Sequence, residues 1–254
     1  MGFFTYLKHD DNDFVQDATV LTPSSEDTTY PASTLKVLPI SNTWRTTGVA
    51  SESLQIALAT AKRITVAGWV NHNLTSAAVA KIYGGSTPNP DGSEFQVTIP
   101  WREHDMYVEL DETYRYWKQV VQDPTNTLGY LEFGYPVGGL LTTLEFNFVF
   151  GWTVSDEFTN IGGYEFGVPN LQEGFEQVRV EMSWEELTEA EATTLRTLFR
   201  SLKGNLNPFF LIPDPAKYEG YFGRFNGPLT ITRHRRYSGP TQFESDSRGL
   251  ALPA

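Results

Sequence analysis

The sequence predicts a mainly β protein, in which an antiparallel β-sandwich is followed by a smaller antiparallel β domain that carries one α-helix. Three observations lead to this prediction. Short segments rich in β-branched and aromatic residues recur along the chain, turns rich in proline and glycine separate them, and a single stretch has helical periodicity. Aromatic residues make up 14% of the 254 residues and methionine contributes only three, a balance more typical of sheets than of helix bundles.

The first part of the chain supplies the strands of the predicted sandwich. Short strands at regular spacing, joined by turns such as "TPNPDGS", "QDPTNT" and "YPVGG", are typical of an antiparallel sandwich or jelly roll. The predicted strands cover residues 53–59, 63–71, 77–84, 94–100, 105–110, 114–122, 128–134 and 141–152.

One helix is predicted over about residues 188–203. Thr188 can cap its start through the side-chain hydroxyl, and Glu191 completes a capping box three residues later. Gly204 can end it in the left-handed conformation. The apolar side chains at helical spacing, which we expect to form one buried stripe, are Leu195, Leu198, Phe199 and Leu202.

A change in composition predicts the domain organisation. Residues 155–174 are polar, interrupted by glycine and without periodicity, as is typical of a linker or long loop. We therefore expect a sandwich domain over 1–154 and a β domain over 175–254, with strands at 175–184 and 208–213 on either side of the helix. The alternative is a single β structure with a long excursion at the same place.

Charge and residue types exclude several classes of protein. With 31 acidic and 19 basic residues the formal net charge is −12, so specific binding of nucleic acid through a broad basic surface is not expected. The absence of cysteine excludes disulfides and thiolate chemistry and fits synthesis in a reducing cytoplasm. Neither a secretory signal nor an uncharged segment of the ~20 residues that span a membrane is present, so no membrane span is expected.

No catalytic, metal or cofactor site is predicted. The four histidines are far apart in the sequence, "HDDNDF" lacks the spacing of a calcium-binding loop, and neither a nucleophile elbow nor a phosphate-binding loop occurs. Carboxylate pairs such as Glu132 and Glu145 can be drawn, but an acidic chain offers many of them. We therefore expect a protein that is not an enzyme and keep a glycan hydrolase only as a distant third alternative.

Exposed aromatic side chains are the main candidates for ligand binding, because aromatic rings at the edge of a sandwich can stack on sugars. Alternation along a strand would place Tyr114 and Tyr116 on one face and Trp117 on the other, so that one of these sets belongs to the core. The candidate carbohydrate-binding residues are Trp101, Arg102, His104, Tyr114 and Tyr116.

The segment "TPSSEDTTYPASTLKVLPISNTWRTTG", followed by "SLQIALATAKRITVAGWVNHNLTSAAVAKIYGG", has a Tyr-Pro-Ala-Ser-x-Leu entry and a Thr-x-Trp-Arg strand. It resembles discoidin-like jelly rolls. The resemblance implies that the Trp44 indole lies in the core and that the Arg45 guanidinium ties down a loop. The resemblance ends at "ALATAK", where the family's usual Asp-Leu-Gly is absent. We therefore do not transfer the family's ligand site to this chain.

The sequence Asn71-His72-Asn73 follows the strand "ITVAGWV" in this segment. Asparagine tolerates turn geometry and bonds nearby backbone groups, and neither a second histidine nor a carboxylate lies at ligand spacing. We therefore interpret His72 as the end of a strand rather than as a catalytic base.

Two stretches are similar to structural proteins of tailed bacteriophages: "NHNLTSAA" after "ITVAGWV", and "RVEMSWEELTEAEATTLRTLFRSLKGNLNPFFLIPDP". The second pattern resembles distal-tail and tail-tip proteins. The resemblance implies a virion protein of the phage tail, synthesised in the host cytoplasm. It would form a homo-oligomeric ring, a hexamer in this family, that joins the tail tube to the host-recognition apparatus.

The implied partners are neighbouring tail-tube and tail-tip proteins, with a host glycan as a further candidate. Around a ring, the acidic charge could line a channel and repel DNA, although it could also face outward. The alternative function is that of a carbohydrate-binding module of an adhesin or host-recognition protein.

Overall fold

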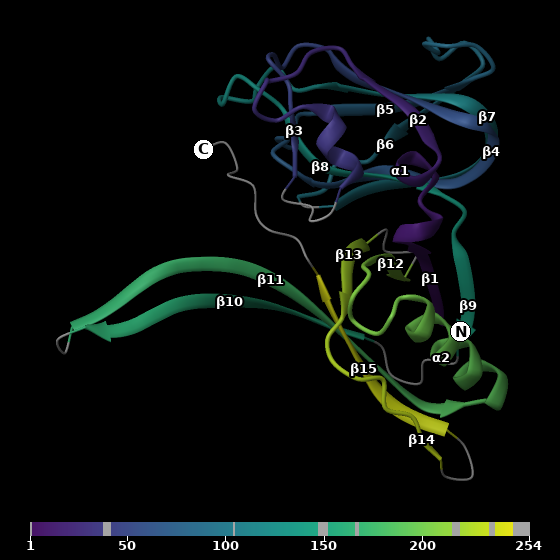
Figure 1. Cartoon of the computed structure of the whole chain (residues 1–254), viewed down its shortest axis with the longest axis vertical. Coiled ribbons are helices and arrows are strands. Elements are labelled where there is room, and N and C mark those ends of the chain that lie inside the picture. The colour runs from purple at the N-terminus through teal and green to yellow at the C-terminus, as the bar shows by residue number, and fades with distance from the viewer. Residues whose placement is uncertain are drawn as a thin grey trace.

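The computed structural model describes residues 2–37, 42–103, 105–146, 152–165, 168–214, 219–233 and 237–245. These residues form two antiparallel sheets and one helix of more than three turns, which confirms the predicted mainly β fold class (Figure 1). Shorter helical segments are α1 (Asp13–Gln16) and two 3₁₀ turns at His9–Asp11 and Ala32–Lys36. Within the described residues, no helix is long and apolar enough to cross a membrane.

The first sheet, here called the jelly-roll sheet, has the strand order β3-β8-β4-β7-β5-β6, and β2 also pairs with β4. Its strands are β2 (Ala18–Pro23), β3 (Trp44–Arg45), β4 (Glu52–His72), β5 (Val79–Gly85), β6 (Phe95–Ile99), β7 (Asp105–Gln122) and β8 (Glu132–Gly139).

Strands β4 and β7 shape the sandwich because both are long enough to run through its two layers. They contain 21 and 18 residues, and each replaces two of the shorter strands that the sequence predicts. Register shifts between Ala57 and Lys62 and between Ile64 and Val66 interrupt their pairing. Irregularities of this kind bend a strand. As a result, the first half of β4 pairs with β2 and the second half with β8.

Buried aromatic side chains fill the space between the two layers. The ring of Phe133 lies 5.2 Å from that of Trp44 and 4.6 Å from that of Trp69, measured between centroids. Trp117, Leu54 and Ile56 complete the same cluster. Burying one such ring removes roughly 150–250 Å² from water and contributes about 4–6 kcal/mol before the entropy cost.

The prediction of a turn at "YPVGG" is wrong, because these residues belong to the buried strand β8. Asn12 holds this strand: its Nδ2 donates to the Pro136 carbonyl at 2.8 Å, and its Oδ1 accepts from the Gly138 amide at 3.1 Å. A Cβ on Gly138 would lie 2.2 Å from the Phe14 ring. The glycine is therefore required for close packing and not for a turn.

The second sheet has the strand order β10-β11-β15-β13-β12-β1-β9, and β14 pairs with β15. Its strands are β1 (Gly2–Lys8), β9 (Thr142–Phe146), β10 (Trp152–Glu165), β11 (Val168–Leu187), β12 (Phe209–Asp214), β13 (Glu219–Phe225), β14 (Thr232–Arg233) and β15 (Tyr237–Ser245).

The jelly roll is inserted into the second sheet, between β1 and β9. Tyr6 on β1 pairs with Thr142 on one side and with Leu211 on the other. The chain therefore leaves the second sheet after its first strand and returns to it after the sandwich is complete. This arrangement differs from the predicted division into 1–154 and 175–254, which assigned the first strand to the sandwich.

The helix α2 (Glu189–Ser201) confirms the predicted capping box. The Glu191 amide donates to the Thr188 hydroxyl at 3.2 Å, and the Thr188 amide donates to the Glu191 carboxylate at 2.6 Å. Gly204 has a φ of +75°, as the predicted left-handed stop requires. The stripe packs as predicted, with Phe199 partly buried beside the buried residues Leu195, Leu198 and Leu202.

An apolar cluster, here called the joint, fixes the two sheets to each other. Tyr107 lies against Phe210 at 5.3 Å and Tyr135 against Phe222 at 5.0 Å, each pair crossing from the jelly-roll sheet to the second sheet. Burial in this cluster raises the pKa of Tyr135 above its ordinary value. The other members of the joint are Leu7, Val15, Val66, Val70, Val137 and Ile212.

Asp105 adds a polar link to the joint. Its carboxylate is buried, and it accepts hydrogen bonds from the Asn71 amide at 3.1 Å and from the Phe222 amide at 3.0 Å. One side chain of the jelly-roll sheet therefore satisfies a backbone donor in each sheet. The joint combines apolar burial with this directed contact, so the two sheets pack as one body.

Candidate functional sites

Residues 155–174 form paired strands, so the prediction of a linker or long loop there is wrong. β10 and β11 pair continuously from Trp152 opposite Met182 to Glu165 opposite Val168, apart from one irregularity. Glycine at positions 162, 163 and 174 interrupts the alternation of apolar and polar residues by which a strand is recognised in a sequence.

The outer part of this ribbon, residues 156–165 and 168–178, is here called the arm. β15 pairs with β11 only between Arg179 and Leu187, so the arm consists of β10 and β11 alone. Ten residues of strand span about 30 Å. Figure 1 shows the arm curving away from both sheets.

Both outer edges of the arm lack a strand partner within the described part of the chain. Such edges present rows of backbone donors and acceptors on which another chain can pair. A two-stranded hairpin by itself is at best marginally stable in water. The arm therefore leaves two backbone edges open to pairing.

The opposite end of the second sheet is also open. β9 pairs with β1 and, among the described strands, with no other. A shallow cleft of about 310 Å³ lies beside it and contains Thr143, Thr5 and Glu109, and desolvation raises the pKa of Glu109. The sheet thus has two different free edges. A contact between unlike surfaces of successive copies is head-to-tail, and it produces a ring when the rotation closes.

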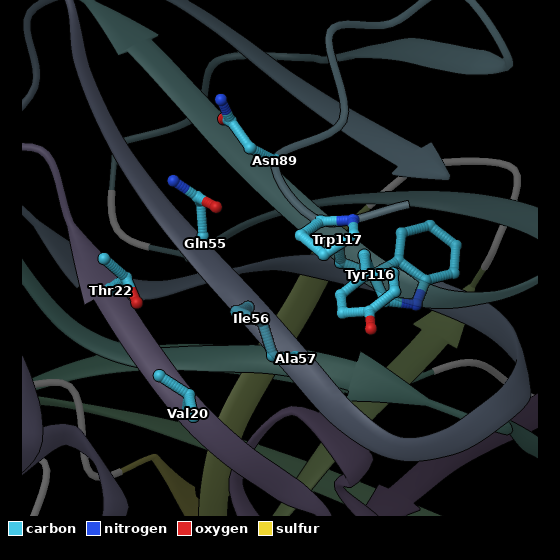
Figure 2. A pocket seen from close by; sticks show the side chains of 9 residues that line it. Val20, Thr22, Gln55, Ile56, Ala57, Asn89, Tyr116 and Trp117 are labelled. Carbon is cyan, nitrogen blue, oxygen red and sulfur yellow. The ribbon is translucent and has the colours of Figure 1, made fainter. Parts of the chain in front are cut away.

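The jelly roll carries a pocket of about 210 Å³ (Figure 2). Strands β2, β4 and β7 form its floor, and the loop between β5 and β6 forms one wall. Tyr116 and Gln55 are half-buried, whereas Thr22 and Asn89 are exposed at the rim. The lining residues are Val20, Thr22, Gln55, Ile56, Ala57, Pro88, Asn89, Tyr116 and Trp117.

Hydrogen bonds hold the loop wall of this pocket in place. Asn89 has a left-handed backbone conformation, with a φ of +58°, and its Oδ1 accepts from the Lys118 ammonium at 2.9 Å. At the ends of the loop, the Glu94 carboxylate accepts from the Ser86 amide at 3.0 Å. The predicted turn at "TPNPDGS" is thus confirmed, and its conformation is fixed by contacts that the pattern does not show.

The structure does not bring the five predicted carbohydrate-binding residues together in this pocket. Trp101 is 36% exposed and donates its indole N–H to the Leu74 carbonyl at 3.2 Å. Arg102 is half-buried, and neither residue lines the pocket. His104 lies outside the described residues.

Tyr114 and Tyr116 lie in different environments, so the prediction that they share a face is wrong. Tyr114 stacks on Phe95 at 6.1 Å and meets Trp117 edge-on at 5.7 Å, and it packs against the sandwich core. Tyr116 lines the pocket. The reason is the register shift in β4–β7 pairing between Ala57 and Lys62, the partners of these two tyrosines.

The roles that the resemblance implies for Trp44 and Arg45 agree with the structure. The Trp44 indole is buried and donates to the Ser25 carbonyl at 3.0 Å. The Arg45 guanidinium lies between the rings of Tyr30 and Tyr130, 4.0 and 4.3 Å from their centroids. It also donates to the Glu132 carboxylate at 2.9 Å.

The strand end at His72 is confirmed, because β4 ends there and Asn71 has a φ of +59°. The buried His72 ring accepts at Nδ1 from the Leu74 amide at 3.2 Å. Asn73 reaches the neighbouring strand, where its Oδ1 accepts from the Glu132 amide at 2.8 Å. No group of three or more histidine or acidic side chains in the described residues is placed to hold a metal ion.

These features define a mainly β protein with an antiparallel jelly roll and a second sheet that projects an arm. No family model and no curated protein matches the chain. Over about half its length it is similar to solved carbohydrate-binding domains. One is the family 32 carbohydrate-binding module from Clostridium perfringens NanJ in complex with galactose, at 14% identity and a TM-score of 0.39, covering 53% of this chain and 98% of that one.

Two further structures are similar at the same level. A Streptococcus pneumoniae fucose-binding module has 10% identity and a TM-score of 0.40, with 53% of this chain and 95% of that one covered. Chitosan-binding module 1 from a Paenibacillus sp. IK-5 chitosanase/glucanase has 13% identity and a TM-score of 0.40, with coverages of 50% and 97%.

Proposed function

We propose that this chain is a structural subunit that assembles into a ring, in the manner of the phage distal-tail proteins that its sequence resembles. The observation that carries the proposal is the arm, a ribbon about 30 Å long that has no strand partner among the described residues. In a ring, the arm of one copy would lie on the next copy and complete its pairing there.

The two free edges of the second sheet support the same proposal. Because β9 and β10 are unlike edges at opposite ends of one sheet, they favour head-to-tail contact over a symmetric dimer. The joint supports it too, since a jelly roll fixed to the second sheet would point in the same direction from every subunit of a ring. The ring would lie in the virion tail, between the tail tube and the host-recognition apparatus.

The acidic charge gives this proposal a further expected property. Each subunit has a formal charge of −12, and we expect a large share of it to face the channel, where it would keep DNA from adhering during passage. A cryo-electron microscopy map of the ring would check this expectation. A neutral or basic channel wall would contradict it without affecting the ring itself.

The proposal is tested by comparing the full chain with a variant whose arm is shortened, in which Asp156 is joined to Val178 through an Asn-Gly turn. Size-exclusion chromatography with light scattering should give a ring-sized oligomer for the full chain and a folded monomer for the variant. Negative-stain images should show closed rings for the full chain only. A full chain that stays monomeric at micromolar concentration, or a variant that assembles equally well, would overturn the proposal.

A second candidate function is carbohydrate binding by the jelly roll. The specific observation in its favour is the pocket in Figure 2, which is lined by aromatic rings, amides and a hydroxyl. A glycan array probed with the full chain tests this candidate independently of assembly. The absence of any bound glycan would remove it.

A further inference from the structure

We propose that the pocket on the jelly-roll face binds one ring of a neutral sugar, which stacks on Tyr116 and is oriented by Gln55 and Asn89. This inference rests on the second candidate function, carbohydrate binding, and not on ring assembly. It assigns the binding to a pocket that contains only one of the five residues predicted from the sequence.

The first step concerns the ring that would carry the sugar. Tyr116 on β7 is paired with Ala57 on β4 and with Gly85 on β5. The directly opposite residue on each neighbouring strand is therefore small, although opposite side chains in a sheet normally pack against each other. No bulky cross-strand partner lies directly opposite the half-buried tyrosine. The Arg115 guanidinium lies 5.2 Å from the centroid of its ring, and because one cation lies over only one face of a ring, the other face remains for a flat, apolar sugar face.

The second step concerns the polar groups around that ring. Gln55 on β4 is the cross-strand partner of Thr22 on β2 and of Lys118 on β7. Because Lys118 donates to Asn89 Oδ1, the Nδ2 donors of Asn89 are the groups left to meet a ligand. Amides and a hydroxyl both donate and accept hydrogen bonds, which suits the hydroxyl groups of a sugar.

The third step concerns charge, which decides the class of sugar. The chain has 31 acidic residues, yet the pocket lining contains no carboxylate, so a cationic ligand would find no counter-charge. The lining contains no cationic side chain either: Lys118 and Arg115 lie beside the pocket, where Lys118 donates to Asn89 and Arg115 donates to the Leu58 carbonyl at 3.2 Å. The lining therefore fits a neutral ligand.

The fourth step concerns size and rigidity. A volume of about 210 Å³ lies below the ~300–1,000 Å³ of pockets for drug-sized ligands, so the pocket accommodates one ring of a saccharide. The loop wall is ordered by its own hydrogen bonds, with Asn89 held in the left-handed region. Strained positions of this kind are often maintained at ligand sites. The pocket is thus formed before the ligand arrives.

The experiment titrates the full chain with a panel of monosaccharides, followed by isothermal calorimetry or ligand-observed NMR. The panel contains neutral sugars (galactose, glucose, mannose, fucose and N-acetylglucosamine), with glucosamine and sialic acid as charged probes. We expect at least one neutral sugar to bind and both charged probes to bind more weakly. Preferential binding of a charged probe would overturn the assignment of a neutral ligand.

Substitutions locate the binding. Tyr116→Ala should abolish it, and Tyr116→Phe should keep it within about threefold because the ring remains. Asn89→Gly, which tolerates the left-handed backbone, and Gln55→Ala should each weaken it about tenfold. Gln96→Ala, on the same sheet but outside the pocket, is the matched control and should change nothing.

The outcomes separate this pocket from carbohydrate binding in general. If Tyr116→Ala fails to fold, Asn89→Gly and Gln55→Ala decide the question, because Asn89 is exposed and Gln55 is only half-buried. If sugars bind but none of these three variants weakens the binding, while Trp101→Ala does, the pocket assignment is overturned and carbohydrate binding stands. If no sugar in the panel or on the array binds, both are overturned.

Discussion

The molecule contains two long antiparallel strand pairs, β4–β7 and β10–β11, and they are completed in different ways. β4 and β7 have further strands on their outer sides, bend at their register shifts and close over a buried core. β15 pairs with β11 only as far as Arg179, and beyond that residue β10 and β11 pair only with each other. The comparison shows that strand length alone does not indicate what a strand packs against. The chain completes the first pair itself, and we propose that a neighbouring copy completes the second.

The largest loss of stability is expected when a side-chain atom is added between β4 and β7. In Gly68→Ala, the added Cβ would lie 2.1 Å from the Met106 carbonyl oxygen and 2.7 Å from the Tyr107 Cα, both of which are backbone atoms of the facing strand. The free energy of unfolding should fall by about 3 kcal/mol or more. Urea denaturation followed by tryptophan fluorescence measures it, with the exposed Thr98→Ala as the control. Equal midpoints for the two variants would contradict the close approach of β4 and β7.

A smaller effect is expected where the closed pair meets the second sheet. In Asp105→Asn, an NH₂ group replaces one of the two oxygens that accept from the Asn71 and Phe222 amides, so a buried donor loses its partner. Stability should fall by about 1–3 kcal/mol. Because the apolar contacts of the joint remain in place, fluorescence and circular dichroism should still report a single transition. Two separate transitions would show that the joint does not hold the sheets together.

The next effect concerns the chain segment that follows the arm. β11 ends at Leu187, and Thr188 caps the helix α2 directly afterwards. Thr188→Ala removes the hydroxyl that accepts from the Glu191 amide, and it should cost about 1 kcal/mol in thermal or urea unfolding. Thr188→Ser keeps a capping oxygen and should recover most of the loss. If the serine variant is as unstable as the alanine variant, the capping box is not the cause.

The smallest effect on stability is expected from the arm itself. Shortening it between Asp156 and Val178 removes pairs that contact no third strand, so the monomer should unfold within ~0.5 kcal/mol of the full chain measured as a monomer at high dilution. A loss of several kcal/mol would show that the arm contributes to the fold of its own chain. The conclusion that the chain itself stabilises β4–β7 but not β10–β11 would then be wrong.

Local signals in the sequence predicted the local structure well. The helix was predictable because its cap, stripe and stop all lie between Thr188 and Gly204. The assignment of strands to the two sheets is not predictable in this way, because pairing partners can be far apart in the sequence. Tyr6, for example, is adjacent to Leu211 in the sheet. The arm was missed because glycine interrupts the alternation that identifies a strand.

The candidate site was only partly predictable for a related reason. Tyr116 was found because exposed aromatic residues are a recognised signal for sugar binding. Gln55 and Asn89 are ordinary residue types on a strand and in a turn, and only the pairing of Thr22, Gln55 and Lys118 across three strands brings them together. The Pro-Asn-Pro sequence of the loop was the one local signal near them.

The insertion of the jelly roll between β1 and β9 also determines the order in which the protein can fold during synthesis. β1 leaves the ribosome before the jelly roll does, but its neighbour β12 begins only at Phe209. At ~20 residues per second, on the order of ten seconds pass before β12 is made. Within that interval the complete jelly roll emerges and can close on its own core. β1 therefore remains unpaired on that side until β12, which follows the jelly roll and the helix α2 in the chain, has been translated.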